Sequence, residues 1–482
     1  MVQRAEIQRL LGLFTMVFSM SMLPPLGVSL FYQDGEATRF ATTLLGTFLI
    51  GVAIWYPAKS HRGELRTRDG FLIVVIFWTV LALLGAIPFM FSPQLTFIEA
   101  LFESMSGITT TGATVIVGLD HLPKSILFHR QQLHAIGGMG VVVLAVAVLP
   151  MLGVGGMQLY QAETPGPVKD TKLTPRIAQT ARAFWMIYLV LTVACALAFW
   201  AAGMTFFDAI CHSFSTVATG GFSTHDASLG YFQSATIEAI AIVFMLLGAL
   251  NFSIHFLAWR HHSLRIFLKD EETRAFLWIV LLLSIFIAGV LVVMETYQNP
   301  IEAFRYSAFH VVSMITTTGF LTADFSTWPL FVPVLIILLA FIGGCGGSTS
   351  GGIKVIRLVV LYKQGLREIR RLIHPKAIIP VKVNGKPISF QVADSIWGFF
   401  FLYIITTVLL TLALMGTGLS PVTAFSAVAG CLNLSGPGLG EVAVTFATVS
   451  ATGKALLTFA MLLGRLEIFT LLVLFSHEFW NR

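Results

Sequence analysis

The chain has 482 residues, of which 56% are hydrophobic and only 11% are charged, and its mean hydropathy is +0.83. Soluble domains carry roughly 25% charged residues, so a soluble protein is excluded, and the length suits a membrane bundle of about ten spans. The net charge of +6 does not indicate nucleic-acid binding, because most of the 30 lysines and arginines fall in segments expected on one side of the membrane. By the positive-inside rule that side is the cytoplasm, which also holds both termini.

Two apolar segments, near residues 10–32 and 40–56, come first in the chain. The first follows Arg4 and Arg9, is longer than the core of a signal peptide and lacks a cleavage pattern of small residues, so we expect it to be retained. Residues 1–68 are therefore predicted to form a pair of helices added in front of the rest. The four cysteines (Cys195, Cys211, Cys345, Cys431) are scattered and predict neither a disulfide framework nor a zinc site.

A four-part unit then recurs: a long apolar span, a short helix, a loop and a second long span. The predicted boundaries are 69–160, 161–262, 263–391 and 392–482 for the four repeats. Their first spans are expected at 71–91, 184–204, 275–294 and 392–415, and their short helices at 95–108, 206–217, 301–315 and 420–432. Their second spans are expected at 126–151, 236–258, 330–361 and 454–480.

The loops carry a repeated motif that begins with Thr109-Thr110-Thr111-Gly112. Copies occur roughly every 100 to 120 residues, as Ala218-Thr219-Gly220-Gly221, Thr316-Thr317-Thr318-Gly319 and, least similar, Leu434-Ser435-Gly436. Irregular backbone at membrane depth persists only where protein covers it or where it lines water. Small residues for close helix packing are the alternative explanation.

Four such loops meeting on one axis would direct carbonyl and hydroxyl oxygens at a dehydrated cation. Glycines at matched positions, proposed as Gly112, Gly220, Gly319 and Gly436, would allow consecutive carbonyls to point one way. The candidate cation-binding residues are Thr110, Thr111, Gly112, Ala218, Thr219, Gly220, Thr317, Thr318, Gly319, Leu434, Ser435 and Gly436. Carboxylates near the starts of three short helices, at Glu99, Asp208 and Glu302, are interpreted mainly as helix caps.

A glycine-rich stretch interrupts the second span of the third repeat. It lacks the ending of a phosphate loop, and no strand precedes it, so a nucleotide site is not expected. We predict a flexible gate below the cation site, with a kink for helix packing as the alternative. The predicted gate residues are Gly343, Gly344, Cys345, Gly346, Gly347, Ser348, Thr349, Ser350, Gly351 and Gly352.

Two further features lie below the loops in this plan. Arg465 and Glu467 fall inside the last span, where Arg465 is expected either to set an electrostatic barrier below the cation site or to form a structural ion pair. The basic, proline-containing segment 362–391 is predicted to be either a docking surface for a soluble partner or a solvated connector.

Together these motifs resemble the membrane subunits of Trk-type potassium-uptake systems, in the superfamily shared with Ktr and HKT transporters. The resemblance rests on the four loops, the glycine-rich stretch and several further motifs: Gly137-Gly138-Met139-Gly140, Gly155-Gly156-Met157, Gly166-Pro167, Gly220-Gly221-Phe222-Ser223-Thr224-His225 and Gly464-Arg465-Leu466-Glu467. It implies a multi-pass protein of the bacterial inner membrane, a homodimer, potassium bound at the loop residues, gating by the glycine-rich stretch and a cytosolic TrkA-type nucleotide-binding ring as partner. No cofactor is expected on this chain, because the nucleotide would bind the partner.

The predicted fold class is thus an all-α integral membrane protein with four pseudo-repeated units around a central ion pore, plus two N-terminal helices. The predicted function is potassium uptake, and obligatory symport of potassium with a proton or sodium is the alternative. An enzyme is not expected, since His212, His225 and His310 lie near loops without the spacing of metal ligands. A scaffold or receptor would leave the four loops unexplained.

Overall fold

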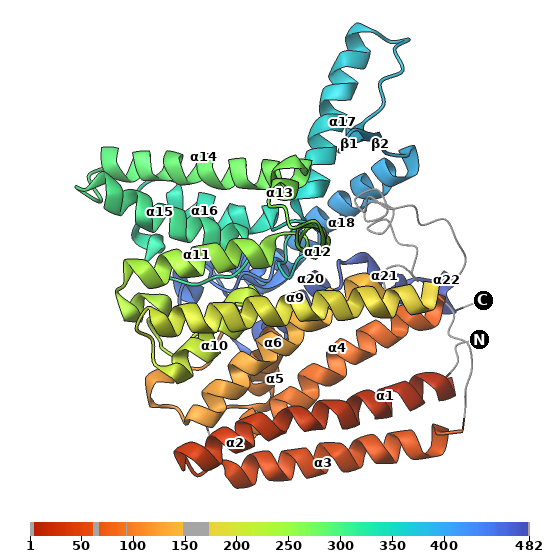
Figure 1. Cartoon of the computed structure of the whole chain (residues 1–482), viewed down its shortest axis with the longest axis vertical. Coiled ribbons are helices and arrows are strands. Elements are labelled where there is room, and N and C mark those ends of the chain that lie inside the picture. The colour runs from red at the N-terminus through yellow and green to blue at the C-terminus, as the bar shows by residue number, and fades with distance from the viewer. Residues whose placement is uncertain (1–3, 61–66, 93, 148–172, 481–482) are drawn as a thin grey trace.

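A computed structural model of the chain describes residues 4–60, 67–92, 94–147 and 173–480. Most of its helices lie side by side along roughly one axis, and α17 (Val355–Ile373) extends away from the bundle (Figure 1). The motifs Gly155-Gly156-Met157 and Gly166-Pro167, the end of the predicted span 126–151 and the boundary at 160/161 lie outside the described residues.

The predicted N-terminal pair is present as α1 (Arg4–Ser19) and α2 (Leu23–Tyr32), joined by a 3₁₀ turn at Met20–Met22, and α3 (Ala37–Trp55), followed by a 3₁₀ turn at Tyr56–Ala58. The first helix begins earlier than predicted. Close packing joins α1 to α3, because a Cβ added at Gly12 would lie only 2.6 Å from the backbone nitrogen of Trp55.

Four units follow. The first contains α4 (Thr67–Met90), α5 (Phe97–Ile108) and α6 (Lys124–Ala147). The second contains α9 (Leu173–Ala201), α10 (Phe206–Val217), α11 (Ala235–Ala249) and α12 (Phe252–His261). The third contains α13 (Arg265–Lys269), α14 (Glu271–Val293), α15 (Pro300–Ile315), α16 (Val332–Ile342) and α17 (Val355–Ile373). The fourth contains α18 (Phe390–Met415), α19 (Pro421–Leu432), α20 (Ala451–Arg465), α21 (Phe469–Phe475) and α22 (His477–Trp480).

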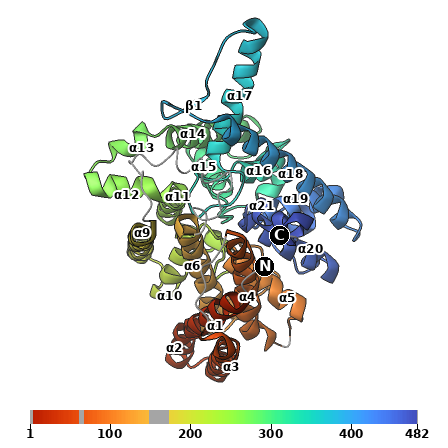
Figure 2. The same ribbon diagram turned by 90° about the vertical axis from the view of Figure 1, so that its right-hand side faces the viewer.

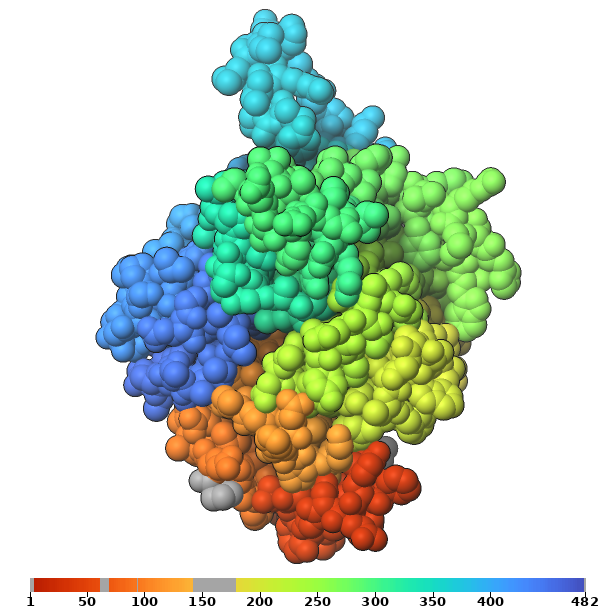
Figure 3. Space-filling model, turned by 90° about the vertical axis from the view of Figure 1, so that its left-hand side faces the viewer, coloured from red at the N-terminus to blue at the C-terminus, as the bar shows by residue number. Residues whose placement is uncertain are grey.

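Shorter elements complete the description. Single 3₁₀ turns lie at Leu119–His121, Ser228–Phe232, Phe325–Thr327 and Gly440–Val442. Strands β1 (Lys382–Val383) and β2 (Lys386–Pro387) pair antiparallel. Seen from the end of the bundle that carries the α2–α3 turn, the four units surround a common centre (Figure 3). From the opposite side, the starts of α1 and α4 face the viewer near the end of the chain (Figure 2).

The four short helices end where the sequence predicts, at Ile108, Val217, Ile315 and Leu432. Each begins at a side-chain cap, in which Thr96, Thr205, Asn299 or Ser420 accepts a hydrogen bond from a backbone N–H of the first turn. Glu99 completes a capping box with Thr96, as expected for that carboxylate.

Two predicted second spans, 236–258 and 454–480, are not continuous helices. The chain bends by 98° between α11 and α12, where Asn251 caps the new helix, and by 113° between α20 and α21. At the second bend Glu467 and Ile468 both have left-handed φ, of 53° and 52°, which a helix cannot accommodate. The predicted span 330–361 is divided between α16 and α17 by the glycine-rich stretch, as expected.

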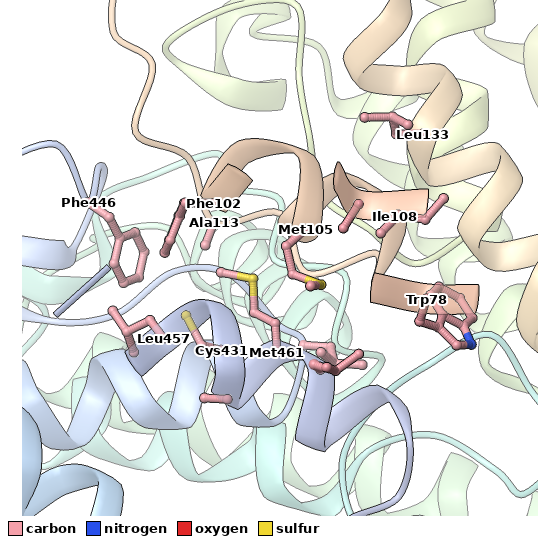
Figure 4. Close-up of a cluster of buried hydrophobic side chains, with 14 of the residues drawn as sticks. Trp78, Phe102, Met105, Ile108, Ala113, Leu133, Cys431, Phe446, Leu457 and Met461 are labelled. Atoms are coloured by element: carbon pink, nitrogen blue, oxygen red, sulfur yellow. The ribbon is translucent and has the colours of Figure 1, made fainter. Parts of the chain in front are cut away.

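Among the described residues, six helices are long and apolar enough to cross a membrane, or eight if each of the two bent pairs is one span. Two large hydrophobic cores among the described residues hold the bundle together. One joins α4, α5 and α6 to α19 and α20, and Figure 4 shows Met105 and Ile108 of the first unit in the same cluster as Cys431 and Met461 of the fourth. The other joins the second and third units. The short helices are therefore fixed in neighbouring pairs.

Candidate ion-binding site

The four loops adopt the same backbone conformation. The second residue after each short helix has a left-handed φ, of 56° at Thr110, 51° at Thr219, 57° at Thr317 and 61° at Leu434. Two residues later a glycine has φ of 82° at Gly112, 83° at Gly221, 79° at Gly319 and 80° at Gly436. A left-handed residue other than glycine costs roughly 1–2 kcal/mol. Its recurrence in all four loops indicates that the surroundings impose this conformation.

Backbone hydrogen bonds show the same equivalence. The residue between the two left-handed positions donates its N–H to the carbonyl five residues earlier, inside the short helix. These bonds are 2.8 Å from Thr111 to Ser106, 2.7 Å from Gly220 to Ser215, 2.8 Å from Thr318 to Ser313 and 2.8 Å from Ser435 to Gly430. Each loop is therefore tied back to the last turn of its short helix by the same hydrogen bond.

The second loop corrects the proposed alignment. Gly220 matches Thr111, and Gly221 is the equivalent of Gly112, because Gly221 has the left-handed φ. The two glycines in sequence allowed either register. Gly220 is needed for a different reason, since a Cβ there would lie 2.4 Å from Nδ1 of the buried His134.

Each loop touches the next, and the fourth returns to the first. A Cβ added at Gly112 would lie 2.2 Å from the carbonyl oxygen of Gly220, and one at Gly221 would lie 1.9 Å from that of Thr318. A Cβ at Gly319 would lie 2.0 Å from the carbonyl oxygen of Ser435, and one at Gly436 would lie 2.8 Å from that of Thr111. The four loops thus form a closed ring, and only hydrogen fits between neighbours at these glycines.

The carbonyls of Thr111, Gly220, Thr318 and Ser435 occupy equivalent places in this ring. Within the described part of the chain, none of the four accepts a hydrogen bond, although all four residues are buried. Buried carbonyls normally find a partner. Four unpaired carbonyls at one level are therefore available to coordinate a cation, which is the arrangement that replaces a hydration shell.

Several loop hydroxyls have protein partners instead. Thr111 Oγ1 lies 2.7 Å from Thr109 Oγ1, and Thr318 Oγ1 lies 2.8 Å from Thr316 Oγ1. Thr317 Oγ1 accepts a hydrogen bond of 2.7 Å from the backbone of Gly351. These hydroxyls brace the loops, which leaves the four carbonyls as the better candidates among the predicted ligands.

A small cavity of about 60 Å³ lies on one side of the ring and is lined by all four ring glycines (Gly112, Gly221, Gly319, Gly436). Its wall also includes Arg130, which pairs with Glu103 at 2.8 Å, and both side chains are almost fully buried. Glu103 accepts hydrogen bonds of 2.9 Å from Thr114 Oγ1 and from the backbone of Val115. Arg130 donates to the carbonyl of Ser223 at 3.0 Å and so ties the first loop to the second.

The sequence analysis missed this ion pair. The two charges are 27 residues apart and lie on different helices, α5 and α6. The only signal was a carboxylate within the short apolar helix of the first repeat, at a position well beyond the cap.

The glycine-rich stretch between α16 and α17 lies against the other side of the ring. Cys345 donates its backbone N–H to the carbonyl of Ala249 at 2.9 Å, at the end of α11. Thr349 Oγ1 donates to the carbonyls of Val217 and Gly248, at 3.1 and 3.0 Å. A Cβ at Gly351 would lie 2.1 Å from the carbonyl oxygen of Asn433. The stretch therefore contacts the second and fourth repeats as well as the ring residue Thr317.

Arg465, the last residue of α20, contacts the same glycine-rich stretch. Its two terminal nitrogens donate to the carbonyls of Thr349 and Gly137, at 3.2 and 3.1 Å, and its guanidinium carbon lies 5.3 Å from the ring of Trp78. Glu467 is paired with Arg357. Arg465 thus contacts backbone carbonyls, while the nearby carboxylate of Glu467 pairs with a different arginine.

The family model described as "TrkH: Cation transport protein" matches residues 36–481. The Trk system potassium uptake protein TrkH of Vibrio parahaemolyticus is 53% identical over 100% of both chains, and that of Escherichia coli K12 is 50% identical over 98% of this chain and 99% of the relative. The crystal structure of the potassium transporter TrkH from Vibrio parahaemolyticus has a TM-score of 0.93 at 50% identity and covers 100% of both chains. These relatives are transporters and not enzymes. The chain belongs to the TrkH family of cation transport proteins.

Proposed function

We propose that this protein takes up potassium across the bacterial inner membrane and that the ring of four loops is its selectivity filter. The closed ring carries the proposal, because it holds four carbonyls at one level that accept no hydrogen bond from the described residues. The names of the relatives, which are potassium uptake proteins, support potassium as the cation. The ion would lose its water at the ring and move inward down the membrane potential, which contributes roughly 2.3 kcal/mol per charge for each 100 mV.

The proposed orientation places the four loops outside and both termini in the cytoplasm. The charge distribution supports it, because basic residues crowd the segments opposite the loops. In agreement with this plan, the start of α1 and the end of α22 lie at the same end of the bundle (Figure 1).

The glycine-rich stretch 343–352 is proposed as the gate. In the proposed orientation it faces the cytoplasmic side of the ring, and its contacts with Val217, Gly248 and Thr317 are hydrogen bonds that can break and re-form. Arg465, held against Thr349, would set the positive charge that an ion meets below the ring.

Regulation by a soluble partner is proposed for the segment 362–391, called here the arm. The arm contains the end of α17 and the β1–β2 hairpin, and it extends beyond the bundle (Figure 1). Its exposed side chains include Tyr362, Leu372 and Ile378, together with several basic residues. A TrkA-type nucleotide-binding ring is the proposed partner and a homodimer the proposed assembly, with the nucleotide on the partner.

Serine substitutions in the ring test the filter. In Gly112→Ser and Gly319→Ser the new side chain meets the carbonyl of the next loop within about 2 Å, so that carbonyl must move. We expect the preference for potassium over sodium to fall about tenfold or more, measured as potassium, rubidium and sodium flux into liposomes. Gly289→Ser in α14 is the matched control, because nothing lies within 4 Å of the added Cβ. Unchanged selectivity in both ring variants would refute the filter.

The same liposomes separate channel-like flow from coupled transport. If potassium moves alone, an imposed proton or sodium gradient leaves the reversal potential where the potassium gradient sets it. A reversal potential that shifts with either gradient would establish symport instead.

A further inference from the structure

The first turn of α14 lies between the arm and the glycine-rich stretch. Asn384, in the turn of the β1–β2 hairpin, donates its side-chain amide to Asp270 at 2.9 Å. Its backbone N–H donates to Glu271 Oε2 at 3.0 Å, and its side-chain oxygen accepts the backbone N–H of Glu271 at 2.8 Å. Lys363 of α17 also pairs with Glu271. The hairpin is thus fastened to the start of α14 directly by the exposed Asn384 and indirectly by Lys363, which also donates to the carbonyl of Lys382 at 2.7 Å.

The next residue, Glu272, is buried and contacts the glycine-rich stretch instead of the hairpin. Its Oε1 accepts the backbone N–H of Gly346 at 2.7 Å and that of Ile356 at 3.1 Å. Gly346 lies in the glycine-rich stretch, and Ile356 is in the first turn of α17, which follows that stretch. Backbone N–H groups in a first helical turn lack partners in their own helix, and a carboxylate there is favoured by the helix dipole. One carboxylate oxygen therefore clamps both sides of the segment that includes Thr349 and Gly351.

We propose that residues 270–272 form a mechanical link in which Glu272 holds the glycine-rich stretch in place and the Asn384 hairpin is the point at which a partner moves it. The proposal rests on the gate proposed above and names the route of its regulation. A partner that displaces the hairpin pulls on Asp270 and Glu271, tilts the first turn of α14 and lengthens the two hydrogen bonds to Glu272. Glu272 is a positioning residue, since it acts on the gate through the backbone of Gly346 and Ile356.

Cys345 provides a readout of the stretch that does not depend on ion flux. It is fully buried within the stretch, next to Gly346. In a full-length protein whose other cysteines are replaced by alanine (Cys195, Cys211 and Cys431), the rate of thiol labelling in liposomes reports how often the stretch leaves its site.

Two variants probe the two ends of the link. Glu272→Gln removes the charge from the clamp, and we expect Cys345 to label about tenfold faster, since bonds to a charged acceptor are roughly twice as strong as neutral ones. Asn384→Gly keeps the left-handed turn, where φ is 47°, but removes the side-chain bonds to α14, and we expect labelling about threefold faster. Glu368→Gln is the control on the arm, because Glu368 pairs only with neighbouring arginines of α17 among the contacts described. It should label at the parent rate.

A double variant tests whether the two ends act through one path. Glu272→Gln combined with Asn384→Gly should label no faster than Glu272→Gln alone, whereas independent effects would multiply. Multiplied rates, or a parent rate in either single variant, would overturn the link. If Glu272→Gln does not fold, Asn384→Gly still tests the link, because Asn384 is exposed and its replacement should not prevent folding. Faster labelling without increased potassium flux would keep the link and reject the gate instead.

Discussion

The two halves of the four repeats, called outer and inner after the proposed orientation, are built under different constraints. Around the ring, all four short helices end alike, and all four loops share their left-handed positions and backbone hydrogen bonds. Below the ring, the second helices differ: α6 is continuous, α11 and α12 meet at 98°, α16 and α17 are separated by the glycine-rich stretch, and α20 and α21 meet at 113°.

The difference follows from closure. Each ring glycine faces a carbonyl of the next loop, so one loop cannot change without displacing its neighbours. No such requirement links the inner ends of the second helices. That half is free to hold parts that differ in each repeat, such as the stretch 343–352 and Arg465. The repeat therefore conserves its geometry at the ring and diverges where control of the pore is proposed.

The largest expected effect comes from breaking the ring at one of its tight contacts. Gly319→Ala places a Cβ 2.0 Å from the carbonyl oxygen of Ser435 at a φ of 79°, so steric overlap adds to a backbone cost of roughly 1–2 kcal/mol. We expect potassium uptake to fall more than tenfold in a liposome flux assay. Gly436→Ala, where the corresponding distance is 2.8 Å, should lose less.

Gly289→Ala is the control for this series, because its added methyl group meets nothing within 4 Å. Equal losses at Gly319 and Gly436 would show that the fourth loop is as tightly constrained as the third. That outcome would contradict the longer contact distance at Gly436. Uptake at the parent level in Gly319→Ala would show that the ring need not be closed.

A smaller effect is expected from the inner half. Thr349→Val keeps the shape of the side chain but removes its hydrogen bonds to the carbonyls of Val217 and Gly248. Losing such buried bonds costs roughly 1–3 kcal/mol, so the stretch should leave its site more often. We expect potassium flux without any partner to rise about fivefold, since about 1 kcal/mol corresponds to a factor of five.

Ser348→Ala is the matched control for that change. The Ser348 hydroxyl bonds only to Cys345 and Ser350 among the contacts described, inside the same stretch. Its loss leaves the contacts with the second repeat intact, so flux should stay near the parent value. A Thr349→Val protein that conducts like the parent would argue that the stretch does not limit flow.

The comparison of the two halves also explains which features the sequence revealed. The ends of the short helices and the ring positions were predictable, because closure forces the same small residues into each copy. The register of the second loop was not, since Gly220 and Gly221 both follow Thr219 and only the backbone angles distinguish them.

The inner half was harder to predict because its two bends carry little local signal beyond the capping residue Asn251. Leu250 and Asn251 at one bend, and Glu467 and Ile468 at the other, are neither proline nor glycine. These bends arise from tertiary contacts, such as the hydrogen bond from Phe252 to the carbonyl of Gly347, that connect segments distant in sequence. The Glu103–Arg130 pair escaped prediction for the same reason.

The smallest expected effect concerns pH at the outer mouth of the ring. His225 is paired with Asp120, lies 3.6 Å from Asp208, stacks on Tyr231 with ring centroids 3.5 Å apart and has the ring of His212 at 6.5 Å. Burial alone would lower the pKa of His225, but hydrogen bonds and attraction from the two carboxylates outweigh it and raise the pKa above 6.5. The paired state is thus fully formed below the ordinary histidine pKa and is lost as the outer pH rises through the raised value.

We therefore expect uptake to change about two- to threefold when the outer pH is raised from roughly 6 to 9, because the loop that carries His225 loosens as the imidazole loses its charge. His225→Gln should abolish this dependence, and Asp120→Asn should shift its midpoint to lower pH, because a carboxylate that holds the proton on His225 is gone. Tyr231→Phe keeps the stacking face and should retain the parent profile. A pH profile identical in His225→Gln and the parent would place the titrating group elsewhere.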